Sequence, residues 1–292
     1  MKVLVTGAFG QLGSEVVRCF RSRGHAVVAP AKQDLNLLRP DQIRQTVFDC
    51  KPDWVLNCAA YTQVDKAEAE AATAFRINRD GAECLAEAVA HYGGRLLQVS
   101  TDYVFDGQQQ RPYRESDATG PQSVYGRSKL AGEQAVLAAL PGAVVLRTAW
   151  VYGIRGRNFV KTMLRLAAAG QVLRVVDDQK GTPTAAADIA QAIAGLTNCD
   201  TRGVFHFTAA GETTWYGFAV AILEEARRIG FRLRTQSVVP ISTAEYPVAA
   251  ARPAYSVLDT TKIRPCLERP APAWRDSLRT MLGELYTCAD CW

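Results

Sequence analysis

The sequence predicts an α/β protein built on a doubly wound parallel sheet, with a smaller C-terminal region. Short apolar runs alternate with helical patterns through the first half of the chain, and a glycine-rich turn and an amphipathic helix follow the first run. Alternating strands and helices indicate parallel βαβ units, and strand, glycine turn and helix in this order indicate a Rossmann-like fold. We expect residues 1–153 to form a dinucleotide-binding domain. Residues 154–292 should be mainly a substrate-binding region, with some segments returning to the first sheet.

Composition narrows the class of protein. The 292 residues carry a formal net charge of +5 without a block of consecutive Lys or Arg, so neither a nucleic-acid partner nor a membrane surface is indicated. The N-terminal apolar stretch is too short for a signal peptide, and no segment reaches the length of a membrane span. We therefore expect a cytoplasmic protein, and the sequence leaves monomer and homodimer open.

The eight cysteines mostly lie in apolar contexts, which favours reduced, buried thiols. Cys288 and Cys291 form a lone C-x-x-C pair near the end of the chain. Without a second pair or a nearby histidine, this pair indicates a tail feature more than a zinc or redox site.

The first strand is predicted at residues 3–5, and its turn has the spacing G-x-x-G-x-x-G. Gly7 permits a tight turn, Gly10 lets the backbone approach a pyrophosphate, and Gly13 lets helix and strand pack closely. A purely structural turn is the alternative. The residues of this turn and helix predicted to bind the cofactor are Gly7, Gly10, Gln11, Leu12 and Gly13.

The second strand, predicted at residues 26–29, should end beside the cofactor ribose. An NAD enzyme usually carries an acid there, but no carboxylate precedes Asp34 in this chain. The missing acid and the nearby Lys32 favour NADPH, whose extra phosphate needs a positive partner, with NADH as the alternative. Lys32 could equally be a solvated loop charge. We expect Asp34 and Leu35 to flank the adenine.

A helix around Ile43 and Val47 precedes a strand predicted at residues 54–58. This strand ends in small residues, which would let a cofactor lie against the backbone. The predicted cofactor contacts here are Ala60, Tyr61 and Thr62. An Ala-rich helical stretch follows up to residue 90, with Glu68 expected to face solvent.

The next strand, predicted at residues 96–99, runs into Thr101, Asp102 and Tyr103. The carboxyl ends of central strands meet the ligand crevice in open α/β sheets, so Thr101 could direct its hydroxyl at a bound carbonyl. A Thr here is also common simply because β-branched residues suit strands. Residues 106–123 are predicted to form a surface loop.

Tyr125 and Lys129 lie four positions apart at the start of a predicted helix. That spacing places both side chains on one helical face. A phenol alone titrates near pH 10, but a fixed positive charge beside it lowers its pKa and makes the hydroxyl a workable proton donor. Such a pair can arise by chance, so its weight depends on the nucleotide turn and the threonine near it.

A strand predicted at residues 144–147 leads to Trp150, and the pattern then becomes less regular. Beyond it, we expect helices starting at residue 158 and spanning residues 188–196, 214–229 and 274–285, and strands at residues 172–176 and 204–207.

With these residues assembled, the chain resembles the extended short-chain dehydrogenase/reductases. The similarity is carried by Thr6 to Gly13, by Ser-Thr-Asp-Tyr-Val-Phe at residues 100–105, and by Tyr-Gly-x-x-Lys-x-x-Gly-Glu from Tyr125. The resemblance implies a reduced nicotinamide cofactor, a nucleotide-sugar substrate, and reduction of the C4 ketone of a dTDP-linked deoxy sugar.

The resemblance also implies roles for individual residues. Tyr125 would give a proton to the C4 oxygen, Lys129 would hold the nicotinamide ribose and tune Tyr125, and Thr101 would hydrogen-bond the same oxygen. The side chains implied to contact the substrate are Thr101, Asp102, Tyr103, Trp150 and Arg252.

Three alternatives remain within this resemblance. Dehydratases of the superfamily carry an Asp-Glu pair after the Thr, whereas this chain has Asp102 and Tyr103, so elimination is poorly supported. A related epimerase or reductase, or a non-catalytic regulatory subunit, stays open.

Some members form a Mg²⁺-bridged dimer through glutamates. Glu15 and Glu284 could correspond to two of them, but Ala187 stands near a third, with Asp188 adjacent, so Mg²⁺ is a doubtful cofactor here. Surface charges are the stronger interpretation of both glutamates, and we assign no residue to a metal.

Overall fold

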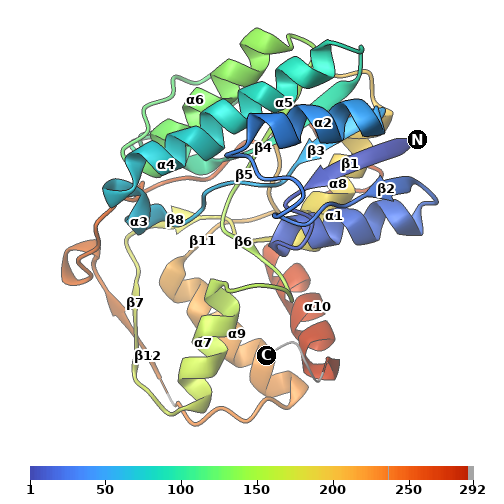
Figure 1. The fold of residues 1–292 in the computed structure, drawn as a ribbon. Coiled ribbons are helices and arrows are strands. Elements are labelled where there is room, and N and C mark those ends of the chain that lie inside the picture. Colours follow the sequence, from blue (N-terminus) through green and yellow to red (C-terminus); the bar gives the residue numbers. More distant parts are fainter. Residues whose placement is uncertain (236, 289–292) are drawn as a thin grey trace.

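The computed structural model describes residues 1–235 and 237–288. Its centre is a parallel sheet of six strands in the order β10-β5-β4-β3-β1-β2 (Figure 1). The strands are β1 (Lys2–Thr6), β2 (Ala26–Val28), β3 (Trp54–Asn57), β4 (Arg95–Thr101), β5 (Val144–Thr148) and β10 (Gly203–His206). The predicted α/β class with a doubly wound parallel sheet is confirmed.

Helices cover both faces of the sheet. α1 (Gln11–Ser22) and α8 (Ala186–Asn198) pack on one face, and α2 (Pro40–Cys50), α5 (Gly81–Ala90) and α6 (Val124–Ala139) cover the other (Figure 1).

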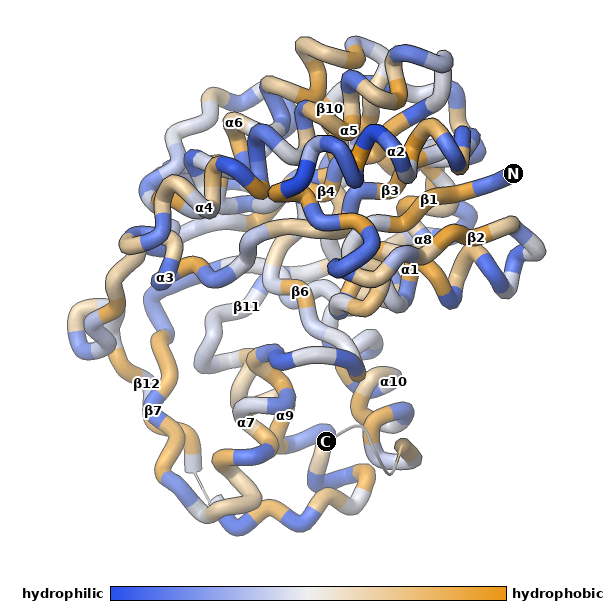
Figure 2. Tube along the Cα trace, in the orientation of Figure 1, coloured by the Kyte–Doolittle hydropathy of each residue, from blue (hydrophilic) through white to orange (hydrophobic). Residues whose placement is uncertain are grey.

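Alternation along each strand supplies the two cores between these layers. In β1, Val3 and Val5 pack with Val16 and Phe20 of α1, while Leu4 faces the opposite core. The Cα trace shows β1 as an apolar run whose N-terminal end is polar (Figure 2). Both sheet faces therefore exclude water, as a doubly wound sheet requires.

The Ala-rich stretch is not one continuous helix. It contains α3 (Val64–Ala69), α4 (Ala71–Phe75) and a π-helical turn (Arg76–Asp80) before α5. The expectation that Glu68 faces solvent is wrong: its carboxylate accepts a hydrogen bond from the Val124 N–H at 2.8 Å. This contact ties α3 to the start of α6.

The C-terminal region has its own core between α7 (Phe159–Ala168), α9 (Trp215–Ile229) and α10 (Trp274–Thr287). Short strand pairs connect it: β6 (Val151–Tyr152) with β9 (Thr184–Ala185), β8 (Lys180–Gly181) with β11 (Thr213–Thr214), and β7 (Leu173–Val176) with β12 (Val238–Ile241). Single 3-10 turns span Asp102–Val104, Thr243–Glu245 and Arg264–Cys266.

The strand order reverses at β1, which lies between β2 and β3. α1 leads from β1 to β2 on one side, and α2 leads from β2 back to β3 on the other side. Such a switch point is where open α/β sheets bind their ligands. The loops that follow β1, β3, β4 and β5 all end at this edge.

Six cysteines of the described residues are free thiols: Cys19, Cys50, Cys58, Cys84, Cys199 and Cys266. The predicted tail feature at Cys288 and Cys291 falls partly outside the described residues, because Cys291 is not among them. Within residues 1–235 and 237–288, no helix combines the length and apolar character needed to cross a membrane.

Candidate active site

The glycine turn after β1 has the geometry of a phosphate cradle. Gly7 adopts the left-handed conformation with φ +62°, and the Gly10 N–H donates to the Gly7 carbonyl at 2.9 Å. A Cβ at Gly13 would lie 2.1 Å from that carbonyl oxygen, so a side chain there is excluded. Because α1 starts without a side-chain cap, the N–H groups of its first turn can bind an anion. These residues fit the pyrophosphate of a dinucleotide.

Gln11 and Leu12 take different positions in this turn. The Gln11 amide donates to the Arg157 carbonyl at 3.2 Å and accepts from the Asn158 side chain at 3.1 Å. Leu12 is buried in the core beneath the turn. Gln11 thus links the turn to the loop before α7, while Leu12 supports it from below.

The residues beyond β2 lie in an exposed turn. Lys32 and Asp34 are exposed, whereas Leu35 is buried beside Ile43 and Val47 of α2. Lys32 is therefore accessible to a cofactor phosphate. The Leu35 side chain supports the turn from inside the core.

Residues 60–62, after β3, are connected to α6 through a residue that we did not predict. The Tyr61 N–H donates to Asn78 Oδ1 at 2.8 Å, and Asn78 Nδ2 donates to Ser128 Oγ at 2.9 Å. Asn78 lies in the π-helical turn and is buried. The Tyr61 hydroxyl donates to Glu70 at 2.8 Å. Ala60 is half-buried and Thr62 is exposed, so both are accessible at the crevice.

Tyr125 and Lys129 occupy the first turns of α6, as predicted. Ser123 caps this helix by accepting from the Gly126 N–H at 3.1 Å. The Tyr125 ring is half-buried, and Lys129 is buried with its Nζ donating to the Val99 carbonyl of β4 at 2.6 Å. The ammonium is therefore anchored to the central sheet.

Thr101 comes from the end of β4, and its side chain interacts with Tyr125 and lowers the pKa of that phenol. Its hydroxyl donates to Asp102 Oδ1 at 3.0 Å and accepts from the Tyr103 N–H at 3.2 Å. Its neighbour in the sheet is Thr148 at the end of β5. The structure thus brings the threonine and the phenol together at the carboxyl edge.

The ionisation of Tyr125 differs from our expectation of a lowered pKa. Burial raises the pKa of Tyr125 to about 12, the Thr101 hydrogen bond lowers it in part, and the charge of Asp102 raises it. Burial also lowers the pKa of Lys129 to about 8. The expected lowering does not occur because the cost of desolvating the phenolate outweighs the favourable interaction with Thr101. The Lys129 ammonium is directed at the Val99 carbonyl and not at the phenol. Tyr125 is a protonated phenol at neutral pH.

Asp102 and Tyr103 lie beside this pair. Asp102 is buried, and burial raises its pKa to about 6, although its interactions with Ser256 and Thr101 oppose the shift. The Tyr103 ring meets the Tyr125 ring edge to face, with centroids 5.8 Å apart. Tyr103 therefore lies directly beside Tyr125, whereas Asp102 contacts the pair through the Thr101 hydroxyl.

Trp150 and Arg252, the other predicted substrate contacts, are each held by another residue. The Trp150 indole stacks on Trp215, which sequence reasoning missed because only its place in a helix was recognised. Arg252 forms a bidentate ion pair with Asp65 of α3, with distances of 2.6 and 3.0 Å. Its charge also acts on Tyr103.

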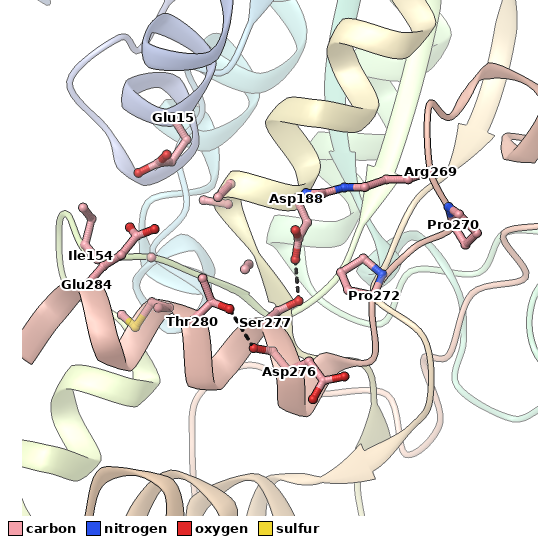
Figure 3. Close-up of a pocket in the computed structure, with 15 residues that line it drawn as sticks. Glu15, Ile154, Asp188, Arg269, Pro270, Pro272, Asp276, Ser277, Thr280 and Glu284 are labelled. Atoms are coloured by element: carbon pink, nitrogen blue, oxygen red, sulfur yellow. Dashed lines mark hydrogen bonds between the residues drawn. The ribbon is translucent and has the colours of Figure 1, made fainter. Parts of the chain in front are cut away.

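Glu15 and Glu284 line a separate pocket of about 270 Å³ between α1, α8 and α10 (Figure 3). Glu15 is bound by Arg18 at 2.5 Å, Asp188 accepts from the Ser277 hydroxyl at 2.6 Å, and Ala187 offers no ligand. Among the described residues, no cluster of three or more His, Cys, Asp or Glu side chains could hold a metal ion. The described residues therefore give no support for a Mg²⁺ site in this pocket.

Comparison with known proteins extends over nearly the whole chain. The family model described as "RmlD substrate binding domain" matches residues 1–287. A dTDP-4-dehydrorhamnose reductase from Burkholderia thailandensis is 43% identical over 298 residues, which cover 98% of this chain and 100% of that protein.

Two solved structures are similar along their full length. A dTDP-4-dehydrorhamnose reductase from Clostridium acetobutylicum superposes with a TM-score of 0.93 at 38% identity, covering 98% of this chain and 100% of that one. A second, from Bacillus anthracis and in complex with NADP, has a TM-score of 0.92 at 36% identity, covering 97% of this chain and 99% of that one.

Proposed function

The chain belongs to the RmlD substrate binding domain family, and from this membership we propose that it reduces the C4 ketone of dTDP-4-dehydro-6-deoxy-L-mannose (dTDP-4-dehydrorhamnose) with NAD(P)H, giving dTDP-L-rhamnose. Full-length similarity to reductases of that name supports the proposal. The observation that carries it is the pair of Thr101 and Tyr125, whose side chains interact at the carboxyl edge of the sheet. Lys129 lies one helical turn from Tyr125, and the glycine turn follows β1 at the same edge.

The chemistry needs one hydride on C4 and one proton on its oxygen. When bound, the reduced nicotinamide supplies the hydride. Tyr125 keeps its proton at neutral pH, because its pKa is raised to about 12, and can give it to the developing alkoxide. We propose that the Thr101 hydroxyl, which donates to Asp102 in the free protein, turns to donate to the same substrate oxygen. The charge of Lys129, one helical turn from Tyr125, would favour the phenolate left behind. A positioned proton donor of this kind typically contributes about 10²–10⁴ in rate.

We propose that the other residues at this edge of the sheet bind the cofactor and the nucleotide sugar. Gly7, Gly10 and Gly13 would hold the cofactor pyrophosphate, and Asp102, Tyr103, Trp150 and Arg252 would contact the nucleotide sugar. The accessible Lys32 favours NADPH over NADH, since it can pair with the extra phosphate. The NADP complex of the similar B. anthracis protein is consistent with this preference.

The setting of the enzyme is also part of this proposal. We expect it to act in the cytoplasm as a monomer or homodimer and to supply dTDP-L-rhamnose for bacterial surface polysaccharide. The neutral Tyr125 beside Thr101 favours this reductase over a non-catalytic nucleotide-binding subunit, which would need neither group.

The test is the variant Tyr125→Phe, assayed for NADPH oxidation with the 4-keto nucleotide sugar and for NADPH binding. We expect kcat to fall at least 10²-fold and the Kd for NADPH to stay unchanged, since only a proton donor is removed. Tyr92→Phe is the matched control, because it deletes a phenol hydroxyl that donates to the Pro52 carbonyl. Turnover that persists in Tyr125→Phe would refute the proton donor.

Two further results separate the alternatives. If the wild type binds NADPH but does not oxidise it with the keto sugar, the regulatory-subunit reading is favoured. If the product is a different sugar, a related epimerase or reductase is favoured. Product identification by nuclear magnetic resonance distinguishes these cases.

A further inference from the structure

Trp150 has an unusual backbone conformation just beyond β5. Its φ is +46°, in the left-handed region that side-chain-bearing residues rarely adopt. Such a conformation persists only where surrounding contacts stabilise it. The backbone carbonyl of Trp150 accepts from the Thr184 N–H at 3.2 Å, which accounts for part of that stabilisation.

The indole of Trp150 is confined by two neighbours from the C-terminal region. Trp215 stacks on it with ring centroids 3.5 Å apart and an interplanar angle of 7°. Gly181 also approaches the indole so closely that a Cβ there would lie 2.5 Å from Trp150 Cε2. With one face covered by Trp215 and Gly181 against the ring, the indole has little freedom to rotate.

The same small structural unit supplies both neighbours. Gly181 of β8 pairs with Thr213 of β11, and Trp215 follows as the first residue of α9. Thr214 caps that helix by accepting from the Gly217 N–H at 2.9 Å. Because β11 leads directly into α9, the strand pair fixes the Trp215 ring and the Gly181 backbone relative to each other.

The stack lies at the edge of the sheet that carries the reacting groups. Trp150 is two residues beyond Thr148, and Thr148 pairs with Thr101 in the sheet. The far side of Trp215 meets Phe159 of α7, with centroids 4.8 Å apart. The stack therefore joins the core of the C-terminal region to the carboxyl ends of β4 and β5.

We propose that Trp215 is a positioning residue that fixes the Trp150 indole where the sugar of the substrate binds. Trp215 acts through Trp150 and does not touch the reacting ketone. The inference rests on the proposed function, in which Trp150 contacts the nucleotide sugar. It assigns Trp215 a role in substrate affinity and leaves proton transfer to Tyr125.

The test combines the variants Trp215→Leu, Trp215→Phe, Trp150→Leu and the double Leu variant. We expect Trp215→Leu to raise KM for the nucleotide sugar about tenfold, in the range of an aromatic pair, with the NADPH Kd unchanged. Trp215→Phe restores most of the affinity because a flat ring still covers Trp150. The double variant should be no worse than Trp150→Leu, since Trp215 acts only through that residue.

Circular dichroism gives a readout that a general loss of stability would not move. Two stacked indoles produce an exciton couplet in the far ultraviolet, and we expect both Trp215 variants to lose it. Trp274→Leu is the matched control: it removes an indole from the same core that meets Phe218 at 5.8 Å, and it should keep the couplet and KM.

Each other outcome overturns the inference. Independent, multiplying effects of the two Leu substitutions would show that Trp215 does not act through Trp150. An unchanged KM in Trp215→Leu, or an equal rise in Trp274→Leu, would remove the positioning role while the reductase proposal stands. A wild type that does not oxidise NADPH with this substrate would refute the proposed function, and this inference with it.

Discussion

The carboxylate of Asp102 is buried beside Thr101 and Tyr125. It is 2% exposed, and burial raises its pKa to about 6 from an ordinary value of 3.8. The Thr101 hydroxyl donates to Asp102 at 3.0 Å, and this bond and the interaction with Ser256 offset the cost only in part. An ionised Asp102 therefore destabilises the fold at neutral pH, which is the behaviour expected of a side chain kept for its site.

This shift predicts how Asp102→Asn changes stability with pH. Between pH 3.8 and about 6 the folded state binds the proton that the unfolded state has released, so the wild type loses stability as pH rises. The variant lacks this loss. We expect the difference in unfolding free energy, variant minus wild type, to grow by about 2–3 kcal/mol from pH 4 to pH 7. Urea titrations at both pH values measure it.

Asp106→Asn is the control with the opposite sign. Its carboxylate accepts from the Tyr113 hydroxyl at 2.7 Å, and that hydrogen bond lowers the pKa of Asp106. Its contribution to stability is present above the ordinary pKa and is lost as pH falls, so this variant should become relatively less stable as pH rises. A pH-independent difference for Asp102→Asn would mean that its charge is not buried.

At the scale of elements, α6 is the helix on which the site depends. Its start is fixed by Ser123 and Glu68, and Glu133 at its middle pairs with Arg147 of β5. The Arg147 guanidinium donates to the Glu133 carboxylate at 2.6, 2.9 and 3.1 Å, and both side chains are at most 5% exposed. This ion pair holds α6 against β5, the strand that pairs with β4 and its last residue, Thr101.

Glu133→Gln should therefore destabilise the protein strongly. The substitution leaves the Arg147 charge buried without its counter-ion, which typically costs about 3–5 kcal/mol. Denaturant unfolding at pH 7 measures this loss. At denaturant concentrations below the unfolding midpoint, where the variant is folded, we also expect a lower kcat. The lost ion pair would let α6 shift, and α6 carries Tyr125 and Lys129.

Arg174→Met provides the matched control for this ion pair. Arg174 pairs with Glu245 at 3.1 Å, but both side chains are more than half exposed. Solvent screening makes such a pair worth less than about 1 kcal/mol. Equal losses in the two variants would contradict the role given to the buried pair.

At the scale of the whole molecule, the elements that could be predicted are those with a pattern among neighbouring residues. The buried strands near residues 3–5 and 144–147 and the helix beginning at Tyr125 follow from apolar runs and spacing within a few residues. The two-residue strands are too short to leave a pattern. Trp215 and Asn78 act through partners far along the chain, so nothing adjacent in the sequence identifies them.

The protonation states of the site residues could not be predicted from the sequence either. Spacing places Tyr125 and Lys129 on one face of a helix, but the pKa of Tyr125 depends on burial and on the direction of the Lys129 ammonium. Both depend on how α6 packs against β4. The spacing of the two residues could be predicted from the sequence, whereas their protonation states needed the packed structure.

The predicted division at residue 153 separates segments that share one core. β10 continues the sheet beyond β5, and Ile189 and Ile193 of α8 pack in the same core as Val16 and Phe20 of α1. Without these segments, residues 1–153 would have an unpaired edge at β5 and an uncovered apolar face. Both features promote aggregation.

We therefore expect residues 1–153 expressed alone to aggregate or stay unfolded, and the full chain to unfold in one transition. Far-ultraviolet circular dichroism and tryptophan fluorescence should give coincident urea curves, because Trp54 reports on the sheet and Trp215 on the C-terminal core. Co-expression of residues 154–292 with 1–153 is the control, since it restores β10 and α8. A soluble 1–153 fragment with its own cooperative transition would show that the sheet is complete without them.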